Sequence, residues 1–266
     1  MRPPSRWKVL PLHTPQCYPL PVNLQDYRAQ VSFRFIEPQT RLPKGYGEFA
    51  KWLRKLGIAL DVLNTRPPKV QAGSWGALRE LCRVPRMSTI AIGALINWAV
   101  ARMPEDQAFV NVGVWNGFTF LAGLAGNTAR TAVGVDNFSA VVAPRDAFLA
   151  RFNSRKTPRQ QFYEMDYRVY FRTVHRGPIG FYIYDGDHSY ENQLEGLRIA
   201  DPFLAAGSLA LVDDTNLAAA RQATLDFVEQ NRQRFRLALD EPTSRNGHPT
   251  FWNGIMVLEK VAPATP

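Results

Sequence analysis

Residues 179–190 of the chain read IGFYIYDGDHSY. The first six form an apolar run, a pattern typical of a strand that is buried on both faces. Asp185 ends this run and begins a polar segment that also holds Asp187 and His188. In a parallel sheet, ligands bind beyond the carboxyl ends of the strands. This junction is therefore the first place in the sequence where a functional site is expected.

The next apolar run ends in the same way. Residues 208–212 lead into Asp213 and Asp214, so four carboxylates and one histidine are expected at the ends of two neighbouring strands. Clustered carboxylates repel one another unless a cation, protons or basic partners offset their charge. Oxygen ligands of this kind suit Mg²⁺, Mn²⁺ or Ca²⁺ better than zinc. The alternative interpretation is that these aspartates only cap turns.

A glycine turn lies upstream, where residues 111–119 read NVGVWNGFT. Glycines in such a turn allow close approach of the backbone to a ligand, and the helix that follows offers free amides to an anionic group. No Lys-Ser or Lys-Thr pair follows Gly117, which excludes a phosphate-binding P-loop. Asp136 ends the next strand about 20 residues further on, where an acidic side chain can hold ribose hydroxyls. Asp166 ends the third strand, where it either contacts an adenine edge or caps a helix.

Short apolar runs alternate with helical segments after Pro104, which indicates βαβ units and a parallel sheet. The expected strands are Phe109–Gly113, Thr131–Asp136, Gln161–Met165, Ile179–Asp185, Ser208–Asp213, Phe235–Leu239 and Thr250–Leu258. Helices are expected near residues 117–126, 144–155, 167–175, 190–204 and 216–233. The sequence therefore predicts an α/β fold: a Rossmann-like, doubly wound, mostly parallel seven-stranded sheet with helices on both faces.

Residues 1–75 differ in character from the rest of the chain. They hold 12 Lys and Arg against 4 Asp and Glu, and half of the 20 prolines, whereas residues 76–266 hold 20 against 19. We expect a basic, Pro-rich extension over residues 1–75, irregular at first and helical near 47–63. It would act as an arm, a lid or a subunit contact in a homo-oligomer. Residues 76–266 would form the main domain, with a helical lead-in at 76–104 that contains segments near 74–84 and 88–103.

The composition excludes several classes of protein. The chain has 266 residues, of which 45% are hydrophobic, so it can bury a core. No apolar stretch reaches the roughly 18 residues of a membrane span, and the N-terminus lacks the apolar run of a signal peptide. Two cysteines are too few for a disulfide scaffold or a cysteine-built zinc site. These features predict a cytoplasmic protein, and the absence of a basic and aromatic stripe in the main domain argues against a nucleic-acid partner.

The glycine turn, the strand end at Val133–Asp136, the segment 185–190 and the strand end at Val212–Asp214 together resemble class I S-adenosylmethionine-dependent methyltransferases. Within these, the chain is most similar to metal-dependent O-methyltransferases of the macrocin type, methyltransferase family 24, which methylate sugar hydroxyls of natural products. The resemblance covers about residues 105–260.

The resemblance implies a role for each motif residue. Residues that would bind S-adenosylmethionine are Gly113, Trp115, Asn116, Gly117, Thr119, Asp136 and Asp166. Those that would hold a divalent metal, Mg²⁺ in the first instance, are Asp185, Asp213 and Asp214. His188 would be the catalytic base. One departure is Asn111, which stands where the family usually has a glutamate and lacks the charge that favours a cationic cofactor.

The chemistry expected of these residues is methyl transfer to oxygen. A metal bound to a substrate hydroxyl lowers its pKa and fixes its position, and a neutral histidine beside it can take the proton. The sequence thus predicts an O-methyltransferase acting on a hydroxyl of a small molecule, a sugar or a glycosylated metabolite. A glycosyltransferase that uses Asp185-Gly186-Asp187 to bind a metal is an alternative. Others are a related hydroxylase and a non-catalytic binding module on a methyltransferase fold.

Overall fold

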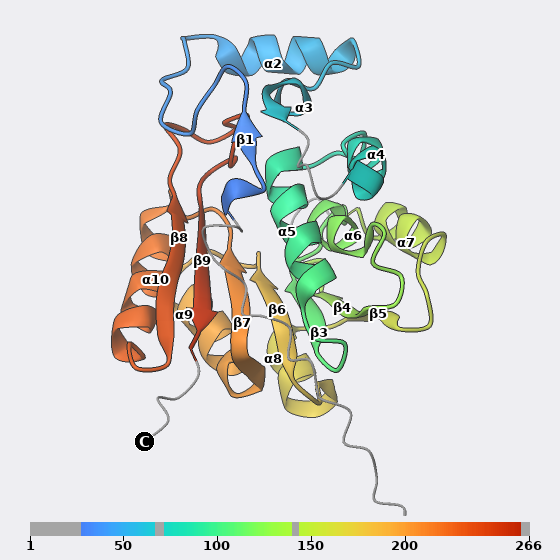
Figure 1. The fold of residues 1–266 in the computed structure, drawn as a ribbon, viewed down its shortest axis with the longest axis vertical. Helices are drawn as coiled ribbons and strands as arrows, with labels where there is room; N and C mark the ends of the chain where they lie inside the picture. Colours follow the sequence, from blue (N-terminus) through green and yellow to red (C-terminus); the bar gives the residue numbers. More distant parts are fainter. Residues whose placement is uncertain (1–27, 67–71, 140–143, 262–266) are drawn as a thin grey trace, which may run out of the picture.

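The computed structural model describes residues 28–66, 72–139 and 144–261. Residues 1–27, the first part of the expected basic extension, lie outside this range. A seven-stranded sheet in the order β5-β4-β3-β6-β7-β9-β8 forms the centre of the molecule (Figure 1). Its strands are β3 (Ala108–Val112), β4 (Thr131–Asp136), β5 (Gln160–Glu164), β6 (Ile179–Tyr184), β7 (Leu204–Val212), β8 (Phe235–Glu241) and β9 (Ile255–Lys260).

The first five strands of this sheet, β3 to β7, pair in parallel. The last strand, β9, inserts between β7 and β8 and runs antiparallel to both. From β3 the chain proceeds outward through β4 and β5, then returns to place β6 on the other side of β3. The order of the chain therefore reverses between β3 and β6, and ligands bind beyond the carboxyl ends of strands at such a reversal.

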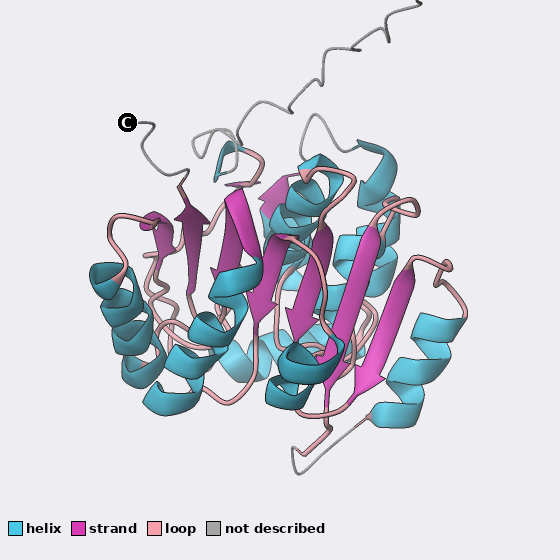
Figure 2. Ribbon diagram, turned by 90° about the horizontal axis from the view of Figure 1, so that it is seen from below, coloured by secondary structure: helices cyan, strands magenta, loops and turns pink. Residues whose placement is uncertain are grey.

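Helices cover both faces of the sheet (Figures 1 and 2). Those of the main domain are α4 (Ala72–Leu81), α5 (Ile90–Arg102), α6 (Phe118–Leu124), α7 (Arg145–Asn153), α8 (Tyr167–Val169), α9 (Tyr190–Ala200) and α10 (Ala218–Gln230). A π-helical turn, η1 (Tyr170–Val174), extends α8, and a 3₁₀ turn, η2 (Asp201–Phe203), extends α9. Together with the mostly parallel sheet, they confirm the predicted Rossmann-like fold.

The central strands alternate their side chains between two hydrophobic clusters. In β6, Phe181 and Ile183 pack into the cluster that contains α5 and α6, whereas Tyr182 and Tyr184 pack into the one that contains α9. Successive side chains of a strand point to opposite faces of the sheet, so an unbroken apolar run supplies both clusters. This is why the segment that opens the sequence analysis consists of apolar and aromatic residues up to Asp185.

All seven expected strands form, and two of them begin four or more residues away from the expected position. The last one begins at Ile255 instead of Thr250, because residues 250–254 form a turn in which Trp252 has φ 54° and Gly254 has φ 82°. The fifth begins earlier, at Leu204 instead of Ser208. Its first residues follow directly on η2, so the chain enters the sheet without a connecting loop.

The single helix expected over residues 47–63 is wrong. The structure has two helices there, α2 (Tyr46–Lys55) and α3 (Leu60–Asn64), at the top of Figure 1. Gly57 separates them with φ 77°, a left-handed conformation that a helix cannot contain. The apolar residues that suggested one helix continue through this turn with nearly helical spacing, which is why the pattern concealed the break.

Residues 28–66 pack against the C-terminal part of the main domain. Two short strands, β1 (Ser32–Phe33) and β2 (Thr65–Arg66), pair with each other. Gln39 Nε2 donates to the Pro242 carbonyl at 2.6 Å, and Ser244 Oγ donates to the Thr40 carbonyl at 2.7 Å. Within the described segments, no helix combines the length and the hydropathy that crossing a membrane requires.

Candidate active site

A cavity of about 700 Å³ lies at the carboxyl ends of β3 to β7. It brings together nearly all the residues that the sequence selected. Those that line it are Gly113, Trp115, Thr119, Asp136, Asp166, Asp185, His188, Asp213 and Asp214. Residues from five strand ends thus meet at the edge of the sheet that the topology identifies.

Asn116 and Gly117 do not line this cavity. Asn116 is buried and accepts from Arg151 of α7, whose Nη1 lies 3.3 Å from both its backbone and side-chain oxygens. Gly117 begins α6 with φ 93°, and a Cβ there would lie 2.6 Å from the Phe148 ring. The structure therefore places these two residues in the packing between α6 and α7, behind the turn that faces the cavity.

Gly113 is the point where two strand ends come closest. Its φ is 78°, and a Cβ on it would lie 1.8 Å from the backbone oxygen of Asp185. No side chain fits there, because 1.8 Å is far inside van der Waals contact. The glycine thus lets the turn after β3 pass directly beside the end of β6, which holds the acidic segment.

Asp136 holds the glycine turn in place through its carboxylate. Its Oδ2 accepts from the amides of Val114 and Trp115 at 2.8 and 2.9 Å, and its Oδ1 accepts from the amide of Phe138 at 2.7 Å. Each carboxylate oxygen can accept more than one hydrogen bond. The side chain therefore retains acceptor capacity toward the cavity while it fixes the backbone.

Asn111, the departure from the family pattern, is fully buried beneath this turn. Its Nδ2 donates to the Gly113 carbonyl at 2.9 Å and to the Val112 carbonyl at 3.2 Å. Its Oδ1 is buried without a hydrogen-bond partner among the described residues. A carboxylate could not donate to these carbonyls, so the amide supports the turn in a way that a glutamate would not.

The acidic cluster surrounds His188. Its Nε2 lies 3.7 Å from Oδ1 of Asp185 and 3.5 Å from Oδ2 of Asp214. Asp213 is buried beside them, and its Oδ1 accepts from the Asp214 amide at 2.9 Å. Asp214 has φ 55°, a conformation that is uncommon outside glycine and that marks a strained turn at the end of β7.

Burial and mutual repulsion control the charges of this cluster. The pKa of Asp185 is raised, chiefly by burial, and the pKa of Asp213 is raised well above its usual value by burial and by the charges of its two acidic neighbours. Burial alone would lower the pKa of His188. The contact with Asp185 and the surrounding carboxylates outweigh that effect and raise it to about 9. In this arrangement the imidazolium is the cation that offsets the carboxylates.

Two atoms of the cluster are left without partners. Asp214 Oδ1 and His188 Nδ1 are buried and make no hydrogen bond within the described part of the chain. No three His, Cys, Asp or Glu side chains of that part are grouped closely enough to hold a metal ion. The acidic side chains are thus near one another and incompletely satisfied, but they are not arranged as a closed set of ligands.

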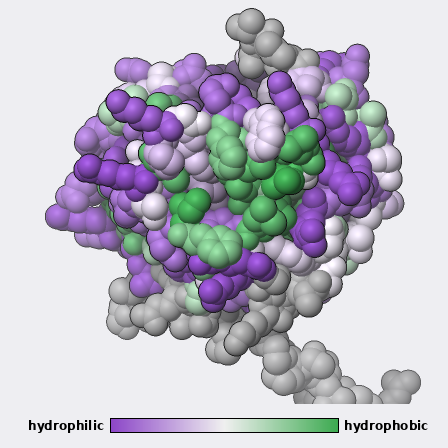
Figure 3. All heavy atoms as spheres, turned by 90° about the horizontal axis from the view of Figure 1, so that it is seen from above, coloured by the Kyte–Doolittle hydropathy of each residue, from purple (hydrophilic) through white to green (hydrophobic). Residues whose placement is uncertain are grey.

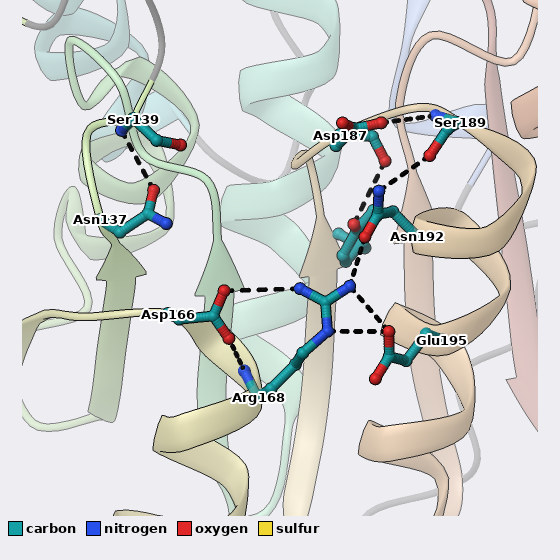
Figure 4. Close-up of polar contacts among 9 residues, drawn as sticks. Asn137, Ser139, Asp166, Arg168, Asp187, Ser189, Asn192 and Glu195 are labelled. Atoms are coloured by element: carbon teal, nitrogen blue, oxygen red, sulfur yellow. Dashed lines mark hydrogen bonds and ion pairs between the residues drawn. The ribbon is translucent and has the colours of Figure 1, made fainter.

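Arg168 forms the other wall of the cavity, and the sequence analysis did not identify it. It lies between Asp166 and Glu195 (Figure 4), with Nη2 at 2.7 Å from Glu195 Oε2 and Nη1 at 3.4 Å from Asp166 Oδ2. Asn192 of α9 accepts from the same guanidinium. The Asp166 Oδ1 accepts from the Arg168 amide at 2.8 Å, so Asp166 caps α8, as the alternative interpretation expected.

Other wall residues come from outside the strand ends. Arg86, Met87 and Ser88 precede α5, and Phe118 begins α6. Arg86 is buried with its Nη2 at 2.9 Å from both carboxylate oxygens of Asp61 in α3, and it lies over the Phe118 ring at 5.4 Å. Phe118 belongs to the glycine-turn motif, whereas no local motif marks Arg86, Met87 or Ser88. Only the pairing of Arg86 with an aspartate 25 positions away brings them to the cavity.

The comparisons with known proteins agree with this geometry. A family model described as a methyltransferase domain, of methyltransferase family 24, matches residues 110–215. No curated protein matches the chain. The matched segment contains the glycine turn, Asp136, Asp166 and the acidic strand ends.

Solved structures share the fold at low sequence identity. The O-methyltransferase TomG from Streptomyces achromogenes, in complex with SAM, is 14% identical, with a TM-score of 0.51 over 83% of this chain and 100% of that chain. A methyltransferase from Podospora anserina, bound to SAH, is 15% identical, with a TM-score of 0.50 over 84% and 99%. An O-methyltransferase from Bacillus cereus, in complex with SAH, is 10% identical, with a TM-score of 0.51 over 80% and 97%.

At these identities the likeness establishes a common fold, while the family model identifies the segment that carries the site. That segment runs from β3 to the turn after β7. It includes both strand ends at which the order of the chain reverses. The match of this family model to residues 110–215 agrees with the resemblance found in the sequence.

Proposed function

We propose that the chain is an S-adenosylmethionine-dependent O-methyltransferase whose acceptor is a hydroxyl of a small molecule, a sugar or a glycosylated metabolite. This proposal rests on the observation that two features lie in the same cavity. The glycine turn after β3 lies directly against the end of β6, where Asp185 and His188 stand. A methyl donor bound at the turn would therefore lie next to groups that can handle a hydroxyl proton.

The cofactor would bind along the ends of β3, β4 and β5. Gly113, Trp115 and Thr119 line that side of the cavity and would contact the methionine end. Asp136 would accept from the ribose hydroxyls with the capacity that its backbone contacts leave free, and Asp166 lies where the adenine would rest. Asn116 and Gly117 would contribute by shaping the turn.

His188 would accept the proton of the acceptor hydroxyl at Nε2. A histidine in this role needs a neutral ring and a position within hydrogen-bond reach of the hydroxyl. Methyl transfer is a displacement at carbon, so the hydroxyl oxygen must also approach in line with the methyl group. Asp185 and Asp214, which lie beside Nε2, would stabilise the imidazolium that forms when the ring takes the proton.

The chemistry of the acidic side chains, although not their present arrangement, would suit a divalent cation such as Mg²⁺. Asp185, Asp213 and Asp214 supply only oxygen ligands, and Asp214 Oδ1 has no hydrogen-bond partner in the described part of the chain. When bound, the cation would lower the pKa of an acceptor hydroxyl. Its charge would also offset the carboxylates that hold His188 in its protonated form, and so favour the neutral ring.

A calorimetric titration of the full chain with S-adenosylmethionine, with and without Mg²⁺, tests the proposal. We expect micromolar binding in both conditions, because the cofactor side of the cavity does not include the acidic cluster. The matched variant is Asp214→Asn, which should bind the cofactor as the wild type does and lose any Mg²⁺ binding measured separately. Failure of the wild type to bind S-adenosylmethionine in either condition would refute the cofactor assignment.

A parallel titration with a nucleotide sugar addresses the glycosyltransferase alternative. Within the Asp185-Gly186-Asp187 motif, the Asp187 Oδ1 accepts from the Ser189 amide at 2.7 Å and so closes the turn before α9. Its side chain is exposed and fixed in this turn, which does not favour a metal site shared with Asp185. The cytoplasmic location, the division at residue 75 and the homo-oligomer stay predictions.

A further inference from the structure

A second cavity, of about 970 Å³, lies where α2, α3 and α4 meet. It is separate from the cavity at the strand ends, and Arg86 is the one residue that lines both. Its charged lining residues are Arg54, Arg79, Glu80, Arg83 and Arg86. Four of these five are arginines, so the cavity has an excess of positive charge that a partner could offset.

The ion pairs of the described residues leave three of these arginines without a carboxylate. Arg86 is neutralised by Asp61, and Glu80 pairs outward with Arg155 at 3.2 Å. Arg79 and Arg83 make no ion pair or side-chain hydrogen bond with residues 28–66, 72–139 or 144–261. Among the described residues, the Arg54 guanidinium contacts the Trp252 ring at 5.8 Å and no carboxylate.

The cavity also has an apolar wall. Ile58, Val62 and Leu63 line one side and Val84 and Pro85 the other. The wall continues onto an exposed apolar surface at this end of the molecule, visible as a patch bounded by polar residues in Figure 3. The exposed apolar side chains of α2, α3 and the turn between them are Phe49, Trp52, Leu56 and Leu63.

The one carboxylate among the described lining residues, Glu80, is paired with Arg155. Burial raises the pKa of the Cys82 thiol to about 12, so this lining residue is neutral at physiological pH. Arg79 stands in the last turn of α4 and Arg83 two residues beyond its end, and both are exposed residues of the cavity lining. Guanidinium groups bind phosphate through paired hydrogen bonds, more strongly where the site is partly shielded from water.

We propose that this second cavity is a binding site for an organic phosphate, in which Arg79 and Arg83 hold the phosphate and the apolar wall holds the group attached to it. The lining has a charged part and an apolar part. A free inorganic ion would contact only the first, and a neutral apolar molecule only the second. The proposal does not depend on methyl transfer, because no residue of the acidic cluster or the glycine turn takes part.

The test is a calorimetric titration of the full chain with octyl phosphate, inorganic phosphate and octyl glucoside. We expect octyl phosphate to bind at least tenfold more tightly than either of the others. Octyl glucoside carries the same chain without the charge, and inorganic phosphate carries the charge without the chain. Equal affinity for octyl phosphate and octyl glucoside would overturn the proposal, as would no binding of octyl phosphate by the wild type.

Two pairs of substitutions locate the site. Arg79→Glu with Arg83→Glu should weaken octyl phosphate binding at least tenfold, and Arg79→Gln with Arg83→Gln should weaken it without adding repulsion. The control is Arg159→Glu with Arg172→Glu, the same charge change at two exposed arginines that line neither cavity. Equal losses in the test and control pairs would contradict the assignment. A titration of every variant with S-adenosylmethionine tests cofactor binding independently, so the two proposals can fail separately.

Discussion

At the scale of single residues, the space available for a Cβ atom distinguishes one glycine of the cavity from a glycine elsewhere. Gly113 and Gly177 both have a positive φ, of 78° and 85°, so an alanine at either carries the same kind of backbone strain. They differ in their surroundings. A Cβ at Gly113 would collide with the Asp185 backbone, whereas one at Gly177 would meet nothing within 4 Å.

This difference predicts unequal losses of stability in two Gly→Ala variants. Gly177→Ala should lower the free energy of unfolding by roughly 1–2 kcal/mol, the cost of the left-handed backbone alone. Gly113→Ala should cost about 3 kcal/mol or more, because the two strand ends must separate. Urea unfolding of both variants checks this. Similar losses in the two proteins would show that the approach of β3 to β6 is looser than described.

His188 makes the second prediction at this scale. With an acceptor that the wild type methylates, His188→Ala should lower kcat by about 10²–10⁴-fold, the usual contribution of a general base. Its affinity for S-adenosylmethionine should change little, because the cofactor side of the cavity lies at other strand ends. His175→Phe serves as a control, since His175 is buried at the opposite end of β6. Full activity in His188→Ala would exclude it as the base.

At the scale of elements, one buried ion pair joins α3 to the segment before α5. Asp61 and Arg86 are both 4% exposed in their side chains, and Asp61 also accepts from the amide of Ile90 at the start of α5. Removal of one partner of a buried pair leaves the other charge uncompensated. Asp61→Ala should therefore lower the free energy of unfolding by about 3–5 kcal/mol.

A double variant tests the cause of that loss. Asp61→Leu with Arg86→Met removes both charges and fills the space with apolar groups, so it should be more stable than Asp61→Ala. Urea unfolding of the three proteins gives the comparison. Both variants lose the bond from the Ile90 amide, so a double variant that is less stable than the single one would show that the bond from Arg86 to the Cys82 carbonyl matters more than the isolated charge.

Elements that depend on local pattern could be predicted, and those that depend on distant contacts could not. The run of β6 is continuously buried and nearly all apolar because both faces of the sheet are covered there, and this pattern can be recognised in the sequence. The turn at Gly57 interrupts an apolar pattern that keeps helical spacing, so only its backbone conformation reveals it. The start of β9 was misplaced because Thr250 and Phe251 are buried in a turn as completely as strand residues are.

The site shows the same division. Asp185, His188, Asp213 and Asp214 end strands, and the carboxyl ends of parallel strands necessarily meet. Arg168 and Arg86 reach the cavity through contacts with residues on other elements, Glu195 and Asp61, which no spacing rule connects. Sequence reasoning therefore found the residues placed by the sheet and missed those placed by packing around it.

At the scale of the molecule, two buried histidines couple stability to pH. His175 and His248 are 3% and 0% exposed, and burial is the main cause that lowers the pKa of each. Histidine in the unfolded chain titrates near 6.5. The unfolded state therefore binds protons more readily than the folded state. The stability that the neutral histidines contribute is present above pH 6.5 and is lost as the pH falls through their lower pKa values in the folded state.

The variant His175→Phe should reduce this dependence. Its free energy of unfolding should fall less than that of the wild type between pH 7.5 and pH 5, whatever its value at pH 7.5. The comparison of slopes is needed because the loss of the 2.8 Å contact between His175 Nδ1 and the Tyr170 hydroxyl also changes stability at every pH. Identical slopes in the two proteins would assign the pH dependence to other groups.

The contacts between residues 28–66 and the C-terminal part of the domain also constrain how the protein is made. Arg28 pairs with Glu241, and the carbonyl of Thr40 accepts from Ser244 and faces His248 Nε2 at 3.2 Å. These partners are more than 200 positions apart in the chain. At a typical rate of 5–20 residues per second, the ribosome needs about 10–40 s to supply the second partner after the first. During that interval Arg28 and Thr40 lack their C-terminal partners, so these contacts form only after synthesis has passed residue 248.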